Sequence, residues 1–257
     1  MKSTYLESFR TLSRKTSNFH SYLSIKGNYY LTETELRKII YDENILKNYA
    51  FNENPTKYYK LFFDIDMKKG MEYMNIINGR ETEVVDYIIE QINKVLNITM
   101  IKPDIRYVYA DKNQGYGIHL FYPGVIVNAR MHKYICEKVI YDIMETDDKK
   151  YQLGKNWRKI LDTAVYLNRH VRMFFFYKDG GYYKPNRQKS TYFISPTDKW
   201  EQFKLCMVGT QFKNYDMKLQ SQLDRRLLGK LNNPKNKIRN KIKKILLNKL
   251  FKIREKF

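Results

Sequence analysis

The chain has 257 residues, a formal net charge of +21 at pH 7 and an isoelectric point near 9.7. Hydrophobic residues make up 43% and aromatic residues 15%, which excludes a disordered chain and supplies ample material for a core. The two cysteines, Cys136 and Cys206, exclude a disulfide scaffold and a cysteine-based zinc site. The excess of basic residues favours a polyanionic partner, with nucleic acid as the first candidate.

Membrane and secretion signals are not found in the sequence. No apolar run approaches the roughly 18–20 residues that are needed to cross a bilayer, and the N-terminus lacks the apolar core of a signal peptide. We therefore expect a soluble, intracellular protein that has no membrane partner.

The N-terminal quarter predicts helical structure. Residues 1–30 favour either a solvated helix or a lead-in segment that faces nucleic acid. Residues 32–48 predict one helix, because Thr32 and Glu35 fit a capping box and apolar residues recur at helical spacing. Residues 52–56 predict a turn.

The next segment, residues 58–66, predicts a buried strand that ends in two carboxylates. Side chains alternate along a strand, so Asp64 and Asp66 should point to the same face. Paired divalent ions held by carboxylates are the usual machinery of nucleotidyl transfer, and such ions would offset the repulsion between two like charges. The alternative is a strand end whose acids meet solvent, which is the more frequent case for an isolated Asp-x-Asp pattern.

The middle of the chain predicts two helices and a hairpin. Amphipathic patterns indicate helices over residues 81–96 and 130–144. Strands are indicated over residues 105–110 and 118–122, with a polar turn over 111–117 between them. His119 lies near the start of the second of these strands.

A further dense segment runs from residue 161 to residue 178. From Val171 onward it is apolar apart from Arg172 and Lys178, which predicts one buried strand with both cations on the same face. Buried cations need an anion. The pattern leaves open whether that anion is a bound phosphate or a core acid such as Asp162.

The C-terminal part predicts a short end to the core and then a basic tail. Residues 179–181 favour a turn, 191–195 a strand, and 200–207 either a helix or a strand. We expect a catalytic core over residues 1–222 and a tail over 223–257. Within the tail, residues 235–257 hold ten basic residues and one acid at amphipathic spacing. That helix should dock on the body or on a partner subunit with its lysines toward DNA, and it could also act as a nuclear-import signal.

Three motifs in this order resemble those of the archaeo-eukaryotic primases. The motifs are a strand with two aspartates, a small-x-His strand, and an Asp followed by Tyr, Asn and Arg before a strand that ends in Lys. Their residues here are Asp64 and Asp66, Gly117 and His119, and Asp162 with Arg172 and Lys178. The third motif looks closest to the PrimPol-like and large-DNA-virus branches. The chain length is similar to that of the baculovirus-type late expression factor that acts as a primase small subunit.

The resemblance implies an α/β (α+β) primase fold, in which an N-terminal α/β unit and an RRM-like unit hold the active site between two sheets. It implies that Asp64, Asp66 and Asp162 are catalytic ligands of two Mg²⁺ or Mn²⁺ ions, with no zinc site. The nucleotide would be bound by four further residues, His119, Gly117, Arg172 and Lys178. Many relatives have Ser at the position of Gly117, and the PrimPol branch has Lys at the position of Gly115, so backbone amides or Lys112 would bind phosphate instead.

The implied function is that of a DNA primase small subunit, which makes short primers from NTPs or dNTPs in viral DNA replication. Its expected partners are a single-stranded DNA template, nucleoside triphosphates and a primase large subunit, with a replicative helicase as a further candidate. The expected location is the nucleus. Two alternatives remain: an inactive single-stranded DNA-binding protein with a relic primase fold, and a metal-dependent nuclease.

Overall fold

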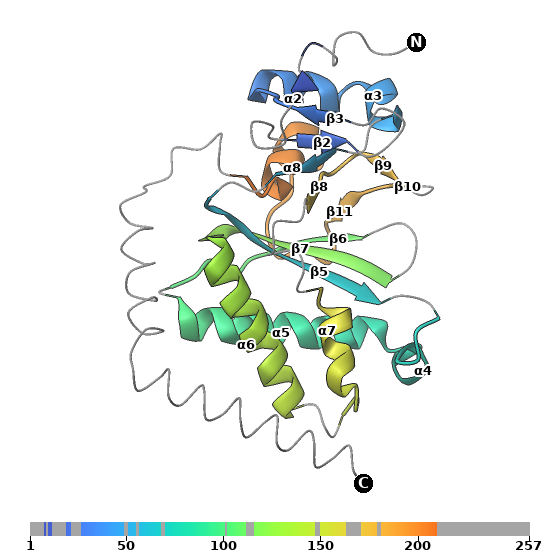
Figure 1. The fold of residues 1–257 in the computed structure, drawn as a ribbon, viewed down its shortest axis with the longest axis vertical. Coiled ribbons are helices and arrows are strands. Elements are labelled where there is room, and N and C mark those ends of the chain that lie inside the picture. Colours follow the sequence, from blue (N-terminus) through green and yellow to red (C-terminus); the bar gives the residue numbers. More distant parts are fainter. Residues whose placement is uncertain are drawn as a thin grey trace. The chain divides into compact units, whose positions relative to one another are not determined.

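Four strands form the central sheet of this computed structural model, in the order β11, β6, β7 and β5 (Figure 1). The structure describes residues 8, 10–11, 19–21, 27–48, 51–54, 57–67, 70–100, 102–111, 116–146, 150–162, 171–178 and 181–209. The strands are antiparallel neighbours and span β5 (Tyr59–Met67), β6 (Val108–Asp111), β7 (Tyr116–Val127) and β11 (Lys184–Asn186). The predicted strands over residues 58–66, 105–110 and 118–122 are thereby confirmed as β5, β6 and β7, with shifted ends. The predicted hairpin is the antiparallel pair of β6 and β7.

Strand β7 continues beyond residue 122, where the sequence predicted its end. Its pairing with β5 shifts register between Lys60 and Leu61, and resumes at Ile126. Pro123 has no N–H to donate to the ladder, so the chain bulges there instead of stopping. The next residue, Gly124, lies so close to Asp104 that a Cβ at Gly124 would be 2.5 Å from the Asp104 Cβ.

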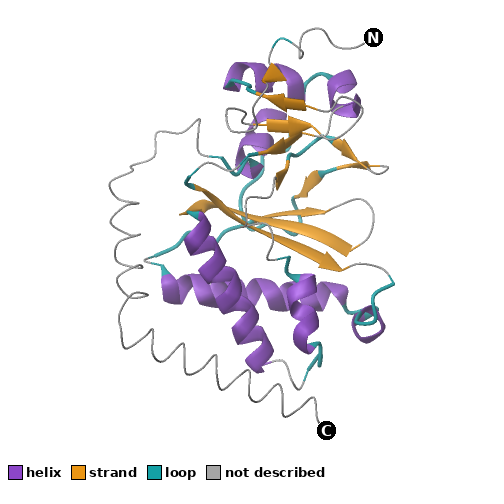
Figure 2. Cartoon of the chain, in the orientation of Figure 1, coloured by secondary structure: helices purple, strands orange, loops and turns teal. Residues whose placement is uncertain are grey.

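Helices cover one face of this sheet (Figure 2). The two long ones are α5 (Glu81–Thr99) and α6 (Ala129–Thr146), which confirms both predicted amphipathic helices. Short helical turns complete the layer: α4 (Met74–Ile77), η1 (Gly154–Asn156) and α7 (Trp157–Ile160). The layer packs because the apolar stripes of α5 and α6 are buried, and that burial is the main driving force for such an arrangement.

Among the described helices, none combines the length and the apolar character that a membrane span requires.

A second sheet has five short strands in the order β1, β3, β2, β4 and β8. They are β1 (Arg10–Thr11), β2 (Phe19–Ser21), β3 (Gly27–Tyr29), β4 (Phe51–Glu53) and β8 (Val171–Arg172). The described part of residues 1–30 is therefore not a helix, and the predicted turn at 52–56 begins inside a strand. The reason is packing: the Phe51 ring is buried and meets the rings of Tyr29 and Phe176 edge-on, each at a centroid distance of 5.2 Å.

The single helix predicted over residues 32–48 is wrong, because two helices occupy that range. The capping box of Thr32 and Glu35 does open the first one, α2 (Glu33–Ile40). The second, α3 (Glu43–Asn48), has its own cap: the Asp42 carboxylate accepts the N–H groups of Asn44 and Ile45 at 3.0 and 3.2 Å.

The single strand predicted from Val171 to Lys178 is also wrong. Strand β8 ends at Arg172, and Phe175 takes a left-handed backbone conformation with φ 67° while its N–H donates to the Tyr183 carbonyl at 2.8 Å. Strand β9 (Tyr177–Lys178) then pairs with β10 (Gly181–Tyr182). Gly181, the last residue of the predicted turn, therefore belongs to a strand, and residues 179–180 lie outside the described part of the chain. Arg172 and Lys178 consequently belong to different sheets.

The segment after β10 also departs from the predictions. Strand β11 was not predicted, and residues 191–195 do not form a strand. The N–H groups of Thr191 and Tyr192 both donate to the Tyr107 carbonyl, at 3.0 and 2.9 Å. Two successive N–H groups that share one acceptor are incompatible with a strand, in which they point to opposite sides. The ambiguous segment near residue 200 is a helix, α8 (Lys199–Cys206), because the Asp198 carboxylate accepts two N–H groups at its start.

A buried glutamate fixes the last described residues to strand β4. The Glu53 carboxylate is 1% exposed and accepts the N–H groups of Val208 and Gly209 at 2.8 and 2.6 Å. Burial raises the pKa of Glu53 to about 7, although these two hydrogen bonds and the nearby Lys60 charge lower it.

This raised pKa predicts that Glu53 makes the protein less stable as the pH rises. Between pH 4.5 and about 7 the carboxyl ionises in the unfolded chain but stays protonated in the folded one, so the free energy of unfolding falls. The loss should reach about 3 kcal/mol above pH 7, since one pKa unit corresponds to about 1.4 kcal/mol. Replacing Glu53 with Gln should remove this dependence.

Urea unfolding of the wild type and the Glu53→Gln variant at pH 5 and pH 8 measures the effect. Between pH 5 and pH 8 the difference in unfolding free energy between the two proteins should change by about 2.5 kcal/mol, because the unfolded carboxyl is already partly ionised at pH 5. Glu90→Gln, at an exposed position on α5, is the control and should leave the pH profile unchanged. A Glu53→Gln profile parallel to that of the wild type would contradict the assignment.

By compactness the chain divides into two units, residues 1–214 and 215–257. All described residues belong to the first unit. The predicted boundary between a core over 1–222 and a tail over 223–257, and the helix over 235–257, lie outside the described residues and stay predictions.

Candidate active site

Asp64 and Asp66 lie on the same face of β5, and both are partly exposed. The other face of the strand is formed by four apolar side chains that are at most 2% exposed: Leu61, Phe63, Ile65 and Met67. This alternation confirms the predicted arrangement of the strand. The two carboxylates therefore lie on the side of the sheet away from the α5 and α6 helices.

His119 lies directly opposite Asp64 in the antiparallel ladder of β5 and β7. Its Nε2 is 3.2 Å from Asp64 Oδ1, and the two side chains are only 7% and 16% exposed. The short distance in a poorly solvated place orients both groups. Two of the three sequence motifs thus meet in one side-chain contact.

Aromatic rings hold the His119 imidazole in place. The Tyr183 ring meets it edge-on at a centroid distance of 4.9 Å, and Phe121 does so at 5.9 Å. Tyr183 in turn stacks on Phe174 at 4.3 Å. Sequence reasoning missed Tyr183 and Phe174, because neither carries a motif signal. Their contacts show that the chain between β8 and β9 packs on the same sheet face as Asp64.

Asp162 follows the short helix α7 and lies next to β5 on the side away from β7. An isolated antiparallel bridge joins Leu161 to Ile65, and the Asp162 N–H donates to the Asp64 carbonyl at 2.9 Å. Antiparallel pairing with this register places Asp162 across from Asp64. Asp162 of the third motif and Asp64 of the first motif are therefore neighbours across the edge of β5.

These pairings define a row across the sheet, which we call the Asp64 row. It consists of Asp162, Asp64, His119, Ala110 and Pro185, in that order. Residues that lie opposite one another in antiparallel strands share a face of the sheet. The row therefore carries an acid, a second acid and an imidazole side by side.

The other predicted site residues are only partly placed. Gly117 lies opposite Asp66 in the β5–β7 ladder, two pairs of residues beyond the row. Arg172 pairs with Asn52 in the five-stranded sheet, and Lys178 pairs with Gly181 in the β9–β10 hairpin. The side chains of Arg172 and Lys178 lie outside what the structure describes, so their phosphate-binding role stays a prediction.

Within the described residues, no group of three or more His, Cys, Asp and Glu side chains is arranged to hold a metal ion. The donor chemistry of the aspartates nevertheless fits Mg²⁺ or Mn²⁺, which prefer carboxylate oxygen. Mg²⁺ usually keeps several water ligands and is bound through one or two carboxylates plus substrate phosphates. A complete protein cage is therefore not needed for Asp64, Asp66 and Asp162 to act as ligands.

Comparison with known proteins identifies the family. No curated protein matches the chain. The sequence model of one family, described as the C962R protein N-terminal AEP domain, matches residues 19–189. This range covers well over half of the chain and contains the whole Asp64 row together with Gly117, Arg172 and Lys178. The chain belongs to the family of the C962R N-terminal AEP domain, within the archaeo-eukaryotic primase superfamily.

Proposed function

We propose that the chain is a DNA primase catalytic subunit, which joins nucleoside triphosphates into short primers on a single-stranded DNA template. Membership of the AEP family supports nucleotidyl transfer of the primase-polymerase type. The single observation that supports a working site is the Asp64 row: Asp64, His119 and Asp162 come from three distant segments and meet at one position of β5.

In this proposal Asp64, Asp66 and Asp162 hold two Mg²⁺ or Mn²⁺ ions, which would activate the primer 3′-hydroxyl and stabilise the charge of the leaving pyrophosphate. His119 orients the Asp64 carboxylate through its Nε2, and it would add a contact to the triphosphate of the incoming nucleotide. Gly117, opposite Asp66, lets a phosphate approach the backbone closely. Arg172 and Lys178 would neutralise the remaining phosphate charge.

The test is incubation of the full chain with a single-stranded DNA template, labelled nucleotides and Mn²⁺. Labelled primers that depend on the template support the proposal. A shortened template would indicate the nuclease alternative. A mobility shift without either product would indicate the inactive DNA-binding alternative. Parallel reactions with NTPs and with dNTPs show which sugar is preferred.

We also propose that the basic tail over residues 235–257 adds non-specific DNA affinity or docks a partner such as a primase large subunit. Its ten basic residues support this role. Deletion after Asn233 should flatten the dependence of log K on log salt, by about 0.7 for each lost contact on single strands. Single-turnover incorporation on a saturating template should persist. A folded deletion variant without any turnover at saturation would place the tail in the active site instead.

A further inference from the structure

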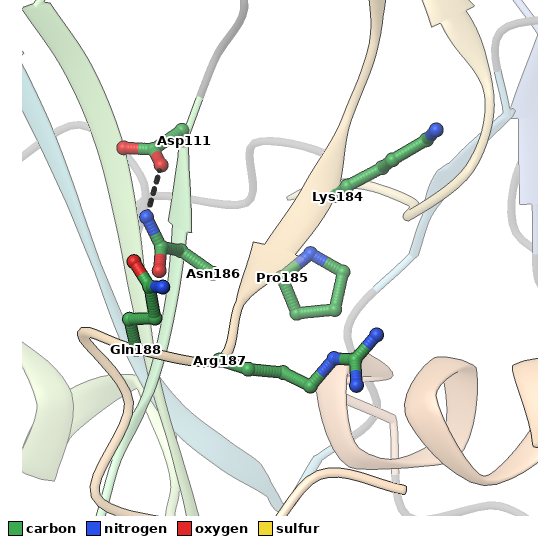
Figure 3. A pocket seen from close by; sticks show the side chains of 6 residues that line it. All are labelled: Asp111, Lys184, Pro185, Asn186, Arg187 and Gln188. Atoms are coloured by element: carbon green, nitrogen blue, oxygen red, sulfur yellow. Dashed lines mark hydrogen bonds between the residues drawn. The ribbon is translucent and has the colours of Figure 1, made fainter. Parts of the chain in front are cut away.

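A polar hollow lies at the outer edge of the central sheet, away from the acids and the imidazole of the Asp64 row. Its volume is about 480 Å³, and six residues of β6, β11 and the following turn line it: Asp111, Lys184, Pro185, Asn186, Arg187 and Gln188 (Figure 3). The only acid in this lining accepts a hydrogen bond from the Asn186 amide at 2.8 Å. Only Pro185 is shared with the row, and the mechanism above uses none of the six.

Positive charge is concentrated along this edge. Residues 184–193 contain Lys184, Arg187 and Lys189 and no acid. In Figure 3 the Lys184 and Arg187 side chains extend to one side of β11, whereas the Asp111 carboxylate lies on the other. Arg187 and Lys189 are exposed, and neither forms an ion pair with an acid of the described part of the chain. An anionic ligand would meet cations that are not already neutralised.

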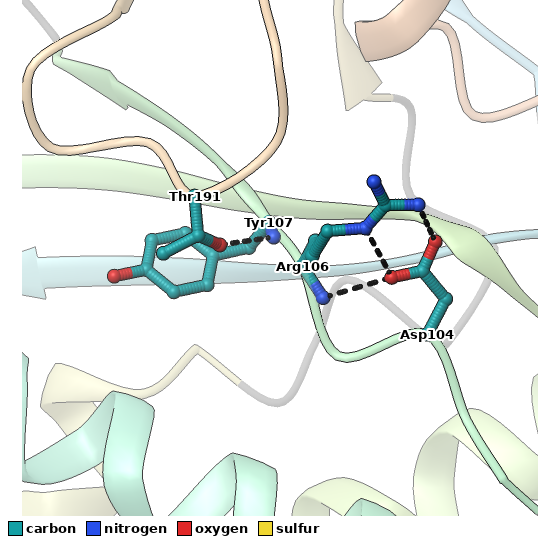
Figure 4. A network of polar contacts seen from close by, with 4 residues as sticks. All are labelled: Asp104, Arg106, Tyr107 and Thr191. Atoms are coloured by element: carbon teal, nitrogen blue, oxygen red, sulfur yellow. Dashed lines mark hydrogen bonds and ion pairs between the residues drawn. The ribbon is translucent and has the colours of Figure 1, made fainter.

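The same segment presents an aromatic ring to solvent. Phe193 is 77% exposed, the largest fraction among the exposed large hydrophobic residues of the described chain. The backbone before it is held firmly, because the Tyr107 N–H donates to Thr191 Oγ1 at 2.9 Å and the Thr191 N–H returns to the Tyr107 carbonyl at 3.0 Å (Figure 4). An exposed ring on a fixed backbone, flanked by cations, is a stacking platform for nucleic-acid bases.

The Arg106 side chain beside this loop has a structural role. Its guanidinium forms a fork with the Asp104 carboxylate at 2.8 and 2.7 Å (Figure 4). Its Cζ also lies 4.7 Å from the centroid of the Tyr192 ring. Its charge is already paired, so Arg106 supports the loop and is not counted among the anion-binding groups.

The hollow lies a few strand spacings from the proposed chemistry. Pro185 is the outermost member of the Asp64 row, and neighbouring strands are about 4.8 Å apart. The β11 edge is therefore about 10 Å from His119 and about 14 Å from Asp64 along the sheet. A nucleic-acid strand held in the hollow would therefore lie three strand spacings from Asp64.

We propose that Lys184, Arg187, Lys189 and Phe193, which we call the β11 edge surface, bind the single-stranded template DNA next to the Asp64 row. The role as template site rests on the proposed primase function; the binding of single-stranded DNA does not. Phosphates lie against the cations, one nucleotide occupies the hollow, and a base stacks on Phe193. A single nucleoside triphosphate is the less suitable occupant, because the cations and the ring are spread along an open edge.

The first test measures binding of a labelled single-stranded deoxyoligonucleotide by fluorescence anisotropy across a salt series, with no nucleotide or metal present. In the Arg187→Ala/Lys189→Ala variant, the slope of log K against log salt should fall by about 1.4, because each single-strand phosphate contact contributes about 0.7. If the lost contacts are purely electrostatic, the two proteins should bind equally at 1 M salt, and the variant should bind about 25-fold more weakly than the wild type at 0.1 M salt. The matched control is Lys94→Ala/Lys133→Ala, which removes two exposed charges from α5 and α6 and should leave the slope unchanged.

The second test separates stacking from general apolar contact. Phe193→Ala and Phe193→Leu should each weaken binding by about fivefold or more, which corresponds to the lower end of base–aromatic stacking energies. Phe193→Trp should retain the affinity, because the indole also stacks. Ile98→Ala, at an apolar position that is 72% exposed on α5, is the control and should have no effect. Circular dichroism checks that all variants are folded.

The outcomes distinguish this proposal from the proposed function. Equal oligonucleotide affinity for the Arg187→Ala/Lys189→Ala variant and its control overturns the β11 edge surface and leaves the primase proposal intact. A raised nucleotide KM with unchanged oligonucleotide binding also overturns it, and assigns the hollow to the incoming nucleotide. Lost oligonucleotide affinity in a chain that makes no primers rejects the primase proposal but supports the DNA-binding surface.

Discussion

Replacing Asp64 and Asp66 together with Ala should lower template-dependent nucleotide incorporation by at least about 1,000-fold. The reason is that both carboxylates lie on one face of β5, and the loss of metal ligands removes several kcal/mol of transition-state stabilisation. The fold should survive, because the change removes two like charges from a partly exposed surface. Primer synthesis with labelled nucleotides and Mn²⁺ measures the effect.

The matched control is Asp86→Ala/Glu90→Ala, which removes two exposed carboxylates from α5 on the opposite side of the sheet. It changes the net charge by the same amount and should incorporate nucleotides at the wild-type rate. Wild-type primer synthesis by the Asp64→Ala/Asp66→Ala variant would remove the basis of the proposed mechanism.

Replacing His119 with Ala should lower kcat/KM by about 10- to 150-fold, the equivalent of a charge-assisted hydrogen bond of about 1.5–3 kcal/mol. Two parameters should change together. The nucleotide KM should rise because a triphosphate contact is lost. The metal concentration for half-maximal activity should rise as well, because His119 Nε2 lies 3.2 Å from Asp64 Oδ1 and helps to orient that carboxylate.

Replacing His119 with Gln separates these two roles. The Gln amide can donate to Asp64, so the metal dependence should return toward the wild-type value while the nucleotide KM stays high. Affinity for the template should barely change in either variant. A His119→Ala protein whose activity falls only in proportion to the folded fraction would instead identify His119 as a core residue.

Local patterns in the sequence predicted the central sheet and its helices well. Alternation along residues 58–66 placed Asp64 and Asp66 on one face, and helical spacing identified α5 and α6. The contact between Asp64 and His119 could not be predicted from such patterns, because it depends on the register between two strands that are more than fifty residues apart. The motif resemblance selected the residues, and the structure shows how three of them meet.

The errors come from segments in which the decisive signal is weak or misleading. Phe175 has a positive φ without the Gly or Asn that usually marks such a turn, so a run of apolar residues resembled one strand. Asp42 is a helix cap inside what resembled one continuous helix. The strands of the five-stranded sheet have only two or three residues each, too few for any alternation to be detected.

The register shift between Lys60 and Leu61 determines where this protein tolerates insertions. Between that shift and residue 67, each residue of β5 has one partner on β7. One residue inserted between Leu61 and Asp64 would turn Asp64 and Asp66 toward the helices and bring apolar neighbours to the site, because side chains alternate with a period of two. At the bulge, by contrast, residues 123–125 of β7 have no partner on β5. Changes in chain length are therefore compatible with this site at the bulge, and incompatible with it only a few residues further along the same pair of strands.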